Sequence, residues 1–324
     1  EKLLKNKGAY KCICTQEELS QRRRINLERK KSIKRLCTDC EMNEKIQSAS
    51  NNYCIRIKVN EKGYTEIEDL VQGNIKISNK EIDNFVLTRN DGSPTYMLSV
   101  VADDYNMGIT HIIRGDDHLN NAFRQYHLYK NLNWHIPKFA HIPLIHGRDG
   151  KKLSKRHGST DINEFKNLGY LPDAIINYLL KLGICSIEDE IFTTSLAIEK
   201  FKLNSVLKSP SKFDYEKLNF INSHYLNNLK NDNIINKLKK YYNLKFEKNR
   251  EEKVNNIINT FKKRTKTLLE LNNIILDYID PNINILNVNI ALEEKKIIKI
   301  FYKEIKNVNK WTSEDIGFII EEFT

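Results

Sequence analysis

Hydrophobic residues along this chain change their spacing several times, and each spacing predicts a different kind of element. In residues 53–59 and 84–89 apolar positions alternate or run together, which is typical of strands. The short apolar runs ITHIIR (109–114) and FAHIPLI (139–145) predict buried strands, and the stretch from about 119 to 133 predicts a helix between them. A strand, a helix and a strand within so short a span predict a βαβ unit, and therefore a parallel pair in the sheet.

Capping residues predict where two further helices begin. Thr15 and Glu18 have the spacing of a capping box, so we expect a helix over 15–35 that carries a dense set of basic side chains. Ser93 is expected to cap, and Pro94 to open, a helix over 95–102. That apolar segment is equally compatible with a strand.

The second half of the chain has a helical pattern. Residues 172–182 predict an amphipathic helix that stops at Gly183. From about 231 to the end, long segments of Ile, Leu, Lys and Asn predict a helical bundle. Within them, NINILNVNI (282–290) alternates with period two and is expected to be partly extended.

Charge adds a candidate partner to this outline. The 324 residues carry a net charge of +11. Residues 1–40 hold twelve Lys and Arg against five Asp and Glu, which accounts for +7 of that excess. Clustered basic charge favours a polyanion such as nucleic acid, although a solvated lysine-rich surface has the same composition. No apolar run is long enough for a membrane span, and 40% hydrophobic residues suit folded domains.

Four of the six cysteines form two close pairs, Cys12 with Cys14 and Cys37 with Cys40. Two such pairs on two turns are typical of a tetrahedral structural zinc site, and buried thiols or a redox pair are the alternatives. Asp39 competes with Cys40 for the fourth position, although thiolate suits zinc better. The remaining cysteines, Cys54 and Cys185, are expected to be core residues.

The glycine-flanked loop 147–158 follows a predicted parallel strand, at the edge of the sheet where ligands bind in open α/β folds. Lys152, Lys155 and Arg156 are placed to meet a triphosphate and to offset charge on a leaving pyrophosphate. Arg114 ends the neighbouring strand, and a guanidinium there can clamp a carboxylate. Taken alone, the loop is better explained as a basic surface loop, because such loops are common.

Other polar residues near this edge have plainer explanations. Asp116, Asp117 and His118 are adjacent in sequence, which disfavours their convergence on one metal ion. Asp103 and Asp104 are expected to be carboxylates at a helix end. The two histidines on apolar strands, His111 and His141, are expected to be satisfied core residues.

Four longer segments resemble bacterial-type glutamyl-tRNA synthetases. They are DGSPTYMLSVVADDYNMGITHIIRGDDHL (91–119), FAHIPLIHGRDGKKLSKRHG (139–158), LPDAIINYLLKLG (171–183) and SPSKFDYEKLNFINSHY (209–225). The resemblance begins by AYKCIC (9–14) and is weaker through the helical C-terminal part. It implies a class I α/β fold with four parts: an inserted zinc-containing α+β acceptor-binding domain (1–89), the second half of a Rossmann catalytic domain (90–158), a stem-contact region (159–230) and an α-helical anticodon-binding domain (231–324).

The resemblance also implies roles for particular residues. Lys152, Ser154, Lys155 and Arg156 match the mobile ATP-binding signature, with Lys155 as the main phosphate contact. Tyr96 and Arg114 match glutamate-binding positions, and the adenosine-side contacts match Asp117, His118, Leu144 and Ile145. Cys12, Cys14 and Cys37 match the zinc site, whose fourth ligand in the family tends to fall at the position of Asp39. Arg22, Arg23 and Arg24 are expected to grip the acceptor arm, and Arg264 lies near an anticodon-reading position.

The activity implied is ATP-dependent formation of glutamyl-adenylate, followed by transfer of glutamate to tRNA(Glu). Its expected cofactors are ATP with Mg²⁺ for catalysis and Zn²⁺ for structure, in a cytoplasmic monomer without membrane contact. No His-x-Gly-His run occurs in these 324 residues, where the family has its first ATP signature. We therefore expect a chain truncated at both ends, which does not activate glutamate by itself; pyrophosphate exchange at a normal rate would contradict this.

Two alternatives remain open at this point. Shorter relatives glutamylate a modified base in a tRNA, but the hundred or so residues beyond 224 argue against that activity. A non-catalytic tRNA-binding protein derived from a synthetase would also lack the first signature, although the intact basic loop argues against it.

Overall fold

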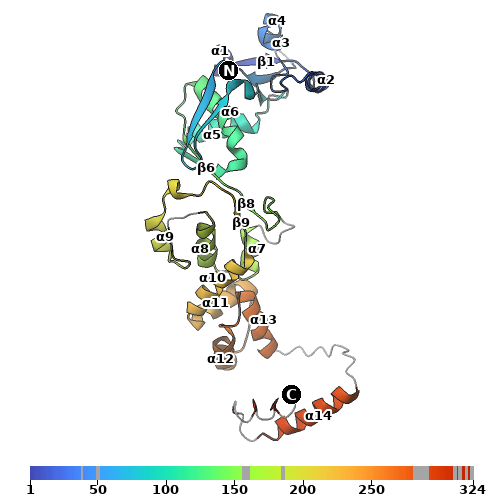
Figure 1. Cartoon of the computed structure of the whole chain (residues 1–324), viewed down its shortest axis with the longest axis vertical. Helices are drawn as coiled ribbons and strands as arrows, with labels where there is room; N and C mark the ends of the chain where they lie inside the picture. Colours follow the sequence, from blue (N-terminus) through green and yellow to red (C-terminus); the bar gives the residue numbers. More distant parts are fainter. Residues whose placement is uncertain are drawn as a thin grey trace. The chain divides into compact units, whose positions relative to one another are not determined.

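The computed structural model describes residues 1–37, 39–48, 52–154, 161–183, 187–279 and 292–308, with positions 312, 316–317 and 320–321. The chain forms two compact units, one of residues 1–245 with 258–272 and the other of residues 246–257 with 273–324. Figure 1 gives the elements in chain order. Among the helices so described, none has the length and apolar character that crossing a membrane requires.

The first unit begins with a short helix, α1 (Lys2–Lys5), and a three-stranded antiparallel sheet. Its strands lie in the order β1 (Ala9–Cys12), β2 (Cys54–Ile57) and β5 (Val86–Thr88), so both strands predicted in this part of the chain are confirmed. Three helices lie between β1 and β2 in sequence: α2 (Gln16–Glu28), α3 (Asp39–Met42) and α4 (Glu44–Gln47).

A second sheet has four strands in the order β4, β3, β7, β6. β3 (Tyr64–Asp69) and β4 (Gly73–Ser78) form a hairpin, which the 3-10 turn η1 (Asn79–Glu81) follows. β6 (His111–Gly115) and β7 (Lys138–Ile142) are parallel and are joined by α6 (Leu119–Leu132), which confirms the predicted βαβ unit. β3 also runs parallel to β7, so the domain boundary expected near residue 89 does not coincide with a break in this sheet.

The helix expected after Ser93 is present as α5 (Tyr96–Asn106), which removes the strand alternative. Its predicted start is wrong, because Thr95 is the capping position and Pro94 instead bridges to Thr88. Ser93 is held in the preceding turn, where its N–H and Oγ both donate to the Asp91 carboxylate at 2.8 and 2.6 Å. Ser93, which was expected to cap the helix, therefore stabilises the turn that precedes it.

The capping box at the start of α2 is confirmed. Thr15 Oγ1 accepts from the Glu18 N–H at 3.2 Å, and the Glu18 carboxylate accepts from the Thr15 N–H at 3.0 Å. The helix is shorter than predicted, because it ends at Glu28 and Lys30 has a left-handed φ of 53°. Arg29, Lys30 and Lys31 thus lie beyond the helix that was expected to carry them.

The core of the first unit forms where the two sheets and two helices meet. Phe123 and Leu128 of α6 are buried with Val101 of α5 and Phe139 of β7. Ile57 of β2 belongs to the same cluster, so one continuous apolar core supports both sheets. This core fixes the position of the β6–α6–β7 unit, whose strand ends carry the polar residues described below.

The rest of the first unit is largely helical. β8 (Ile145–His146) pairs in parallel with β9 (Ser211–Lys212), and between them lie α7 (Ile162–Asn167), α8 (Pro172–Gly183), α9 (Thr194–Lys200) and the 3-10 turn η4 (Leu203–Ser205). α8 confirms the predicted amphipathic helix. α10 (Tyr215–Asn228) and α11 (Asn231–Tyr242) follow.

The predicted helical C-terminal region is confirmed in the residues that the structure describes. After η5 (Lys248–Arg250) come α12 (Glu251–Phe261), α13 (Leu268–Ile279) and α14 (Leu292–Lys306). α11 belongs to the first compact unit, and the second unit begins at residue 246. The segment 282–290, expected to be partly extended, lies outside the described residues.

Candidate active site and metal centre

Arg114 stands at the C-terminal end of β6 and is held by three hydrogen bonds. Its Nε donates to Nε2 of His141 at 3.2 Å. Its Nη2 donates to Oε1 of Gln125 at 2.8 Å and to the His118 carbonyl at 3.3 Å. A guanidinium has five N–H groups, and these three contacts involve Nε and Nη2.

Tyr96 lies beside the same guanidinium. It is the first residue of α5, it is 55% exposed, and it forms a side-chain hydrogen bond with Arg114. Burial lowers the pKa of Arg114, while the nearby Tyr96 and Asp104 raise it. An arginine remains charged under such opposing effects, so a half-buried cation beside an accessible phenol forms a site suited to a carboxylate.

The adenosine-side and loop residues predicted from the sequence also meet. Asp117, in the 3-10 turn η2 (Asp116–His118), pairs with the Lys152 ammonium at 2.7 Å, and this contact lowers the pKa of Asp117. A Cβ added to Gly115 would lie 2.7 Å from Oδ1 of Asp117 and 3.4 Å from Leu144. Gly115 therefore allows Asp117 and Leu144 to approach the end of β6 closely.

The loop after β8 turns back on this strand. The Gly150 N–H donates to the Gly147 carbonyl at 3.0 Å, and the Leu153 N–H donates to the Ile145 carbonyl at 2.9 Å. This turn brings Lys152 opposite His146. Ser154 is the last described residue of the loop; Lys155 and Arg156, the predicted phosphate contacts, lie outside the described residues.

The histidines near this site differ from expectation. His141 is buried, as predicted, but it contacts Arg114 on one ring nitrogen and the Asp69 carboxylate on the other, at 2.6 Å. His111 is exposed, so its prediction as a core residue is wrong.

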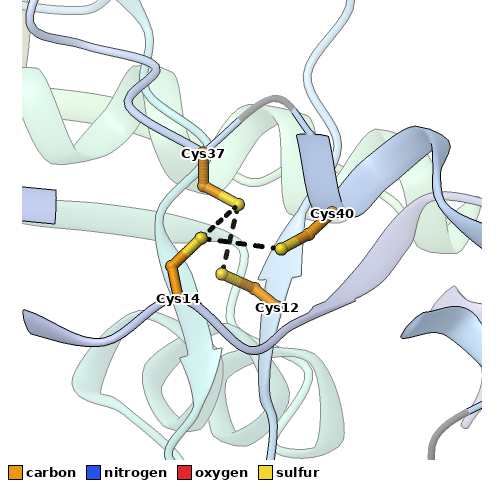
Figure 2. Close-up of side chains that lie close together, drawn as sticks. All are labelled: Cys12, Cys14, Cys37 and Cys40. Carbon is orange, nitrogen blue, oxygen red and sulfur yellow. Dashed lines mark hydrogen bonds between the residues drawn. The ribbon is translucent and has the colours of Figure 1, made fainter. Parts of the chain in front are cut away.

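Four thiols converge between β1 and α3, as Figure 2 shows. The Sγ atom of Cys37 lies 3.2 Å from that of Cys12 and 3.5 Å from that of Cys14, and Cys14 and Cys40 are also 3.5 Å apart. All four sulfurs lie within 4.8 Å of one another. Around a zinc ion with bonds of about 2.3 Å, tetrahedral sulfurs are roughly 3.8 Å apart, so the donor set and spacing are compatible with that ion.

The electrostatics of the cluster point the same way. The hydrogen bond between Cys12 and Cys37 lowers the pKa of Cys12, whereas burial raises the pKa of Cys14 to about 12. The contact with Cys12 also raises the pKa of Cys37. Close thiols resist joint ionisation because thiolates repel one another, and a bound cation removes that resistance.

Asp39, the rival fourth ligand, is not among the groups that converge at the cluster. Its carboxylate pairs with Nη2 of Arg22 at 2.8 Å, and its side chain is 71% exposed. Cys40, by contrast, is buried within the cluster. Cys54, expected to be an isolated core residue, is buried beside the cluster because it lies opposite Cys12 in the β1–β2 pair. Cys185 lies outside the described residues.

The arginines proposed for tRNA contact have different environments. Arg22 donates to the Leu36 carbonyl at 3.1 Å as well as pairing with Asp39, so it supports the segment that leads to Cys37. Arg24 pairs with Glu28 at 3.2 Å, while Arg23 and Arg264 are exposed. Among the first three, Arg23 and Arg24 are thus the accessible ones.

Comparison with known proteins agrees with this arrangement. Residues 1–220 match the family model described as tRNA synthetases class I (E and Q), catalytic domain. A glutamate–tRNA ligase 2 of Paramagnetospirillum magneticum is 39% identical over 97% of the chain and 68% of its own length. That of Rickettsia typhi is 42% identical over 99% of the chain and 69% of its length.

Solved structures give the same result. A glutamate tRNA ligase from Elizabethkingia meningosepticum, in complex with its amino acid, has a TM-score of 0.72 at 27% identity. The match covers 99% of this chain and 70% of that one. A glutamate–tRNA synthetase from Elizabethkingia anophelis gives a TM-score of 0.74 at 26% identity.

The fold and the site therefore define a class I tRNA synthetase catalytic domain followed by a helical C-terminal region. Within that class, the chain belongs to the glutamate–tRNA ligase family. Neither alternative left open by the sequence is favoured, because the relatives described above are glutamate–tRNA ligases and match through the helical C-terminal region as well.

Proposed function

We propose that this chain acts in an enzyme that joins glutamate to tRNA(Glu) with ATP. The observation that supports this most directly is the paired site at the end of β6. There Arg114 and Tyr96 offer a carboxylate-binding group. Asp117, three residues after Arg114, pairs with Lys152. An amino acid and a nucleotide bound at these two places would be neighbours, which is the main requirement for adenylate formation.

In this proposal each group binds or orients rather than transferring a proton. The Nη1 edge of Arg114 and the Tyr96 hydroxyl hold one carboxylate of glutamate, while the other carboxylate attacks the α-phosphate of ATP. Lys152 and Ser154, with Lys155 and Arg156, offset charge on the pyrophosphate as it leaves. Asp117, His118, Leu144 and Ile145 contact the adenosine. Mg²⁺, bound with ATP, would neutralise phosphate charge.

Two further assignments belong to the same proposal. Cys12, Cys14, Cys37 and Cys40 would hold a structural zinc ion, which gives no open position for chemistry. Residues 1–89, 90–158, 159–230 and 231–324 would serve as the acceptor-binding, catalytic, stem-contact and anticodon-binding parts, with Arg23, Arg24 and Arg264 as phosphate or base contacts. Five free cysteines among the described residues fit a reducing cytoplasm.

Aminoacylation assays test the main proposal. The enzyme expressed from its full reading frame should attach labelled glutamate, and not aspartate or glutamine, to tRNA(Glu). Arg114→Gln should abolish most of this charging, whereas Arg89→Gln, which removes a cation bonded to the exposed turn at Ser93 and Pro94, should leave it intact. Charging of a different amino acid, or equal activity in both variants, would contradict the proposed function.

A further inference from the structure

A buried chain of polar groups leads from β3 to Arg114. Asp69, the last residue of β3, accepts a hydrogen bond from Nδ1 of His141 at 2.6 Å, and both side chains are fully buried. The other ring nitrogen, Nε2, receives the Arg114 Nε–H at 3.2 Å. The carboxylate, imidazole and guanidinium thus form a continuous series that ends at the proposed glutamate site.

The bonding of Asp69 fixes where the imidazole proton lies. Oδ1 accepts from the backbone N–H groups of Val71, Gln72 and His141 at 3.0, 2.9 and 3.1 Å. Oδ2 is the atom that faces Nδ1 of His141. An ionised carboxylate only accepts hydrogen bonds, so the proton between the two side chains belongs to Nδ1. Burial would raise the pKa of Asp69, but these donors lower it, which keeps the carboxylate ionised.

With its proton on Nδ1, a neutral His141 presents a lone pair on Nε2. Only that lone pair can accept from Nε of Arg114, because the other tautomer and the imidazolium would both set one N–H against another. Burial lowers the pKa of His141 more than Asp69 raises it, in keeping with a neutral ring. Gln125 and the His118 carbonyl then hold Nη2, and Tyr96 also interacts with the guanidinium.

We propose that Asp69 and His141 are positioning residues for glutamate: the buried carboxylate selects the imidazole tautomer whose Nε2 accepts from Arg114, and this contact turns the guanidinium so that Nη1 meets the substrate carboxylate. The inference rests on the proposed function. It adds two residues that need not touch the substrate, one of which comes from the hairpin before residue 89.

Asp69→Asn is the most selective perturbation. Its side-chain oxygen can keep the three backbone contacts of Oδ1, while its NH₂ group takes the place of Oδ2. Because an amide NH₂ donates, His141 must move its proton to Nε2, where it opposes the Arg114 Nε–H. In the enzyme expressed from its full reading frame, we expect the KM for glutamate to rise about 10- to 100-fold in pyrophosphate exchange. The KM for ATP should change less than about twofold, because the nucleotide side keeps its contacts.

A matched control removes a different carboxylate of the same unit. Asp83 is partly buried, and its carboxylate pairs with Arg124 at 2.7 Å, outside the Asp69–His141–Arg114 series. Asp83→Asn should leave the KM for glutamate unchanged. If Asp69→Asn behaves like this control, with an unchanged KM for glutamate, the proposal is overturned.

The tautomer itself can be measured on the folded wild-type chain, which removes any dependence on the folding of the variant. In ¹⁵N NMR, His141 should show a protonated Nδ1 and an unprotonated Nε2 at neutral pH. An Nε2-protonated ring or an imidazolium would overturn the positioning role. Failure of the wild-type enzyme to charge glutamate would instead refute the proposed function, and the NMR result would still report on Asp69 and His141.

Discussion

The fourth position of the thiol cluster gives the sharpest test of the metal proposal. Spacing alone left Cys40 and Asp39 as rivals, and the two residues are adjacent in α3. Cys40→Ser removes one sulfur from the cluster with little change of volume, whereas Asp39→Asn removes only the exposed partner of Arg22. We expect the first substitution to weaken zinc binding strongly and the second to leave it unchanged.

The expected size of the effect follows from the geometry. The closest sulfurs are 3.2 to 3.5 Å apart, so reaching the tetrahedral separation of roughly 3.8 Å requires only small side-chain movements. Structural zinc contributes about 10–16 kcal/mol in small zinc-binding peptides, and one of four thiolates carries roughly a quarter of that. After partial replacement by serine or water, affinity should fall about 100-fold. The exposed Arg22–Asp39 pair contributes at most about 1 kcal/mol to stability.

Zinc content and chelator competition measure both outcomes. The wild-type chain and Asp39→Asn should each retain one equivalent of zinc after gel filtration, and should lose it at the same chelator concentration. Cys40→Ser should lose its zinc at a concentration about 100-fold lower. Full retention of zinc by Cys40→Ser together with its loss from Asp39→Asn would show that the carboxylate is the ligand and that the assignment of Cys40 is wrong.

Three further predictions concern the active site and the stability of the fold. Arg114→Lys should raise the KM for glutamate about 100-fold, because one ammonium cannot replace a guanidinium that bonds to His141, Gln125 and a substrate at once; steady-state kinetics measure this. Gly169→Ala should destabilise the chain by about 3 kcal/mol or more in urea titrations, because the new Cβ would lie 2.4 Å from the Leu269 nitrogen at a backbone φ of 87°. As a control, Gly150→Ala has a similar φ of 75° but open space around the new Cβ, so it should cost only about 1 kcal/mol. Burial lowers the pKa of His127 from 6.5 to about 4, so between pH 6.5 and pH 4 the unfolded chain binds more protons than the folded one. Roughly 3 kcal/mol of stability, present above pH 6.5, should therefore be lost as the pH falls towards 4. His127→Gln should flatten this dependence of stability on pH in urea titrations.

Local signals were sufficient for the elements that carry the site. The βαβ unit was predictable because a buried strand, a helix with a polar face and a second buried strand each have their own apolar spacing. The capping box of α2 was also predictable from local sequence, because Thr15 and Glu18 bond to backbone groups only three residues away. The start of α5 was mispredicted because two local motifs competed for Ser93, and the turn with Asp91 prevailed.

The contacts that organise the site were not predictable in this way. Asp69 and His141 are separated by 72 positions, and their contact depends on the register of β3 against β7. Neither residue has a neighbour in sequence that marks it as functional, and a histidine on an apolar strand is usually a satisfied core residue. The same holds for Cys54, which joins the thiol cluster only through its pairing with Cys12.

The pairing of β3 with β7 joins strands from both sides of the domain boundary expected near residue 89. The hairpin β3–β4 precedes residue 89, in the part that the resemblance assigns to tRNA acceptor binding. Yet Asp69 at the end of β3 is joined to His141 by both backbone and side-chain hydrogen bonds, and His141 contacts Arg114. The Asp69 and His141 side chains are both fully buried. The proposed glutamate site thus draws on both parts of the chain, because β3, which ends in Asp69, and β6, which carries Arg114, both pair with β7.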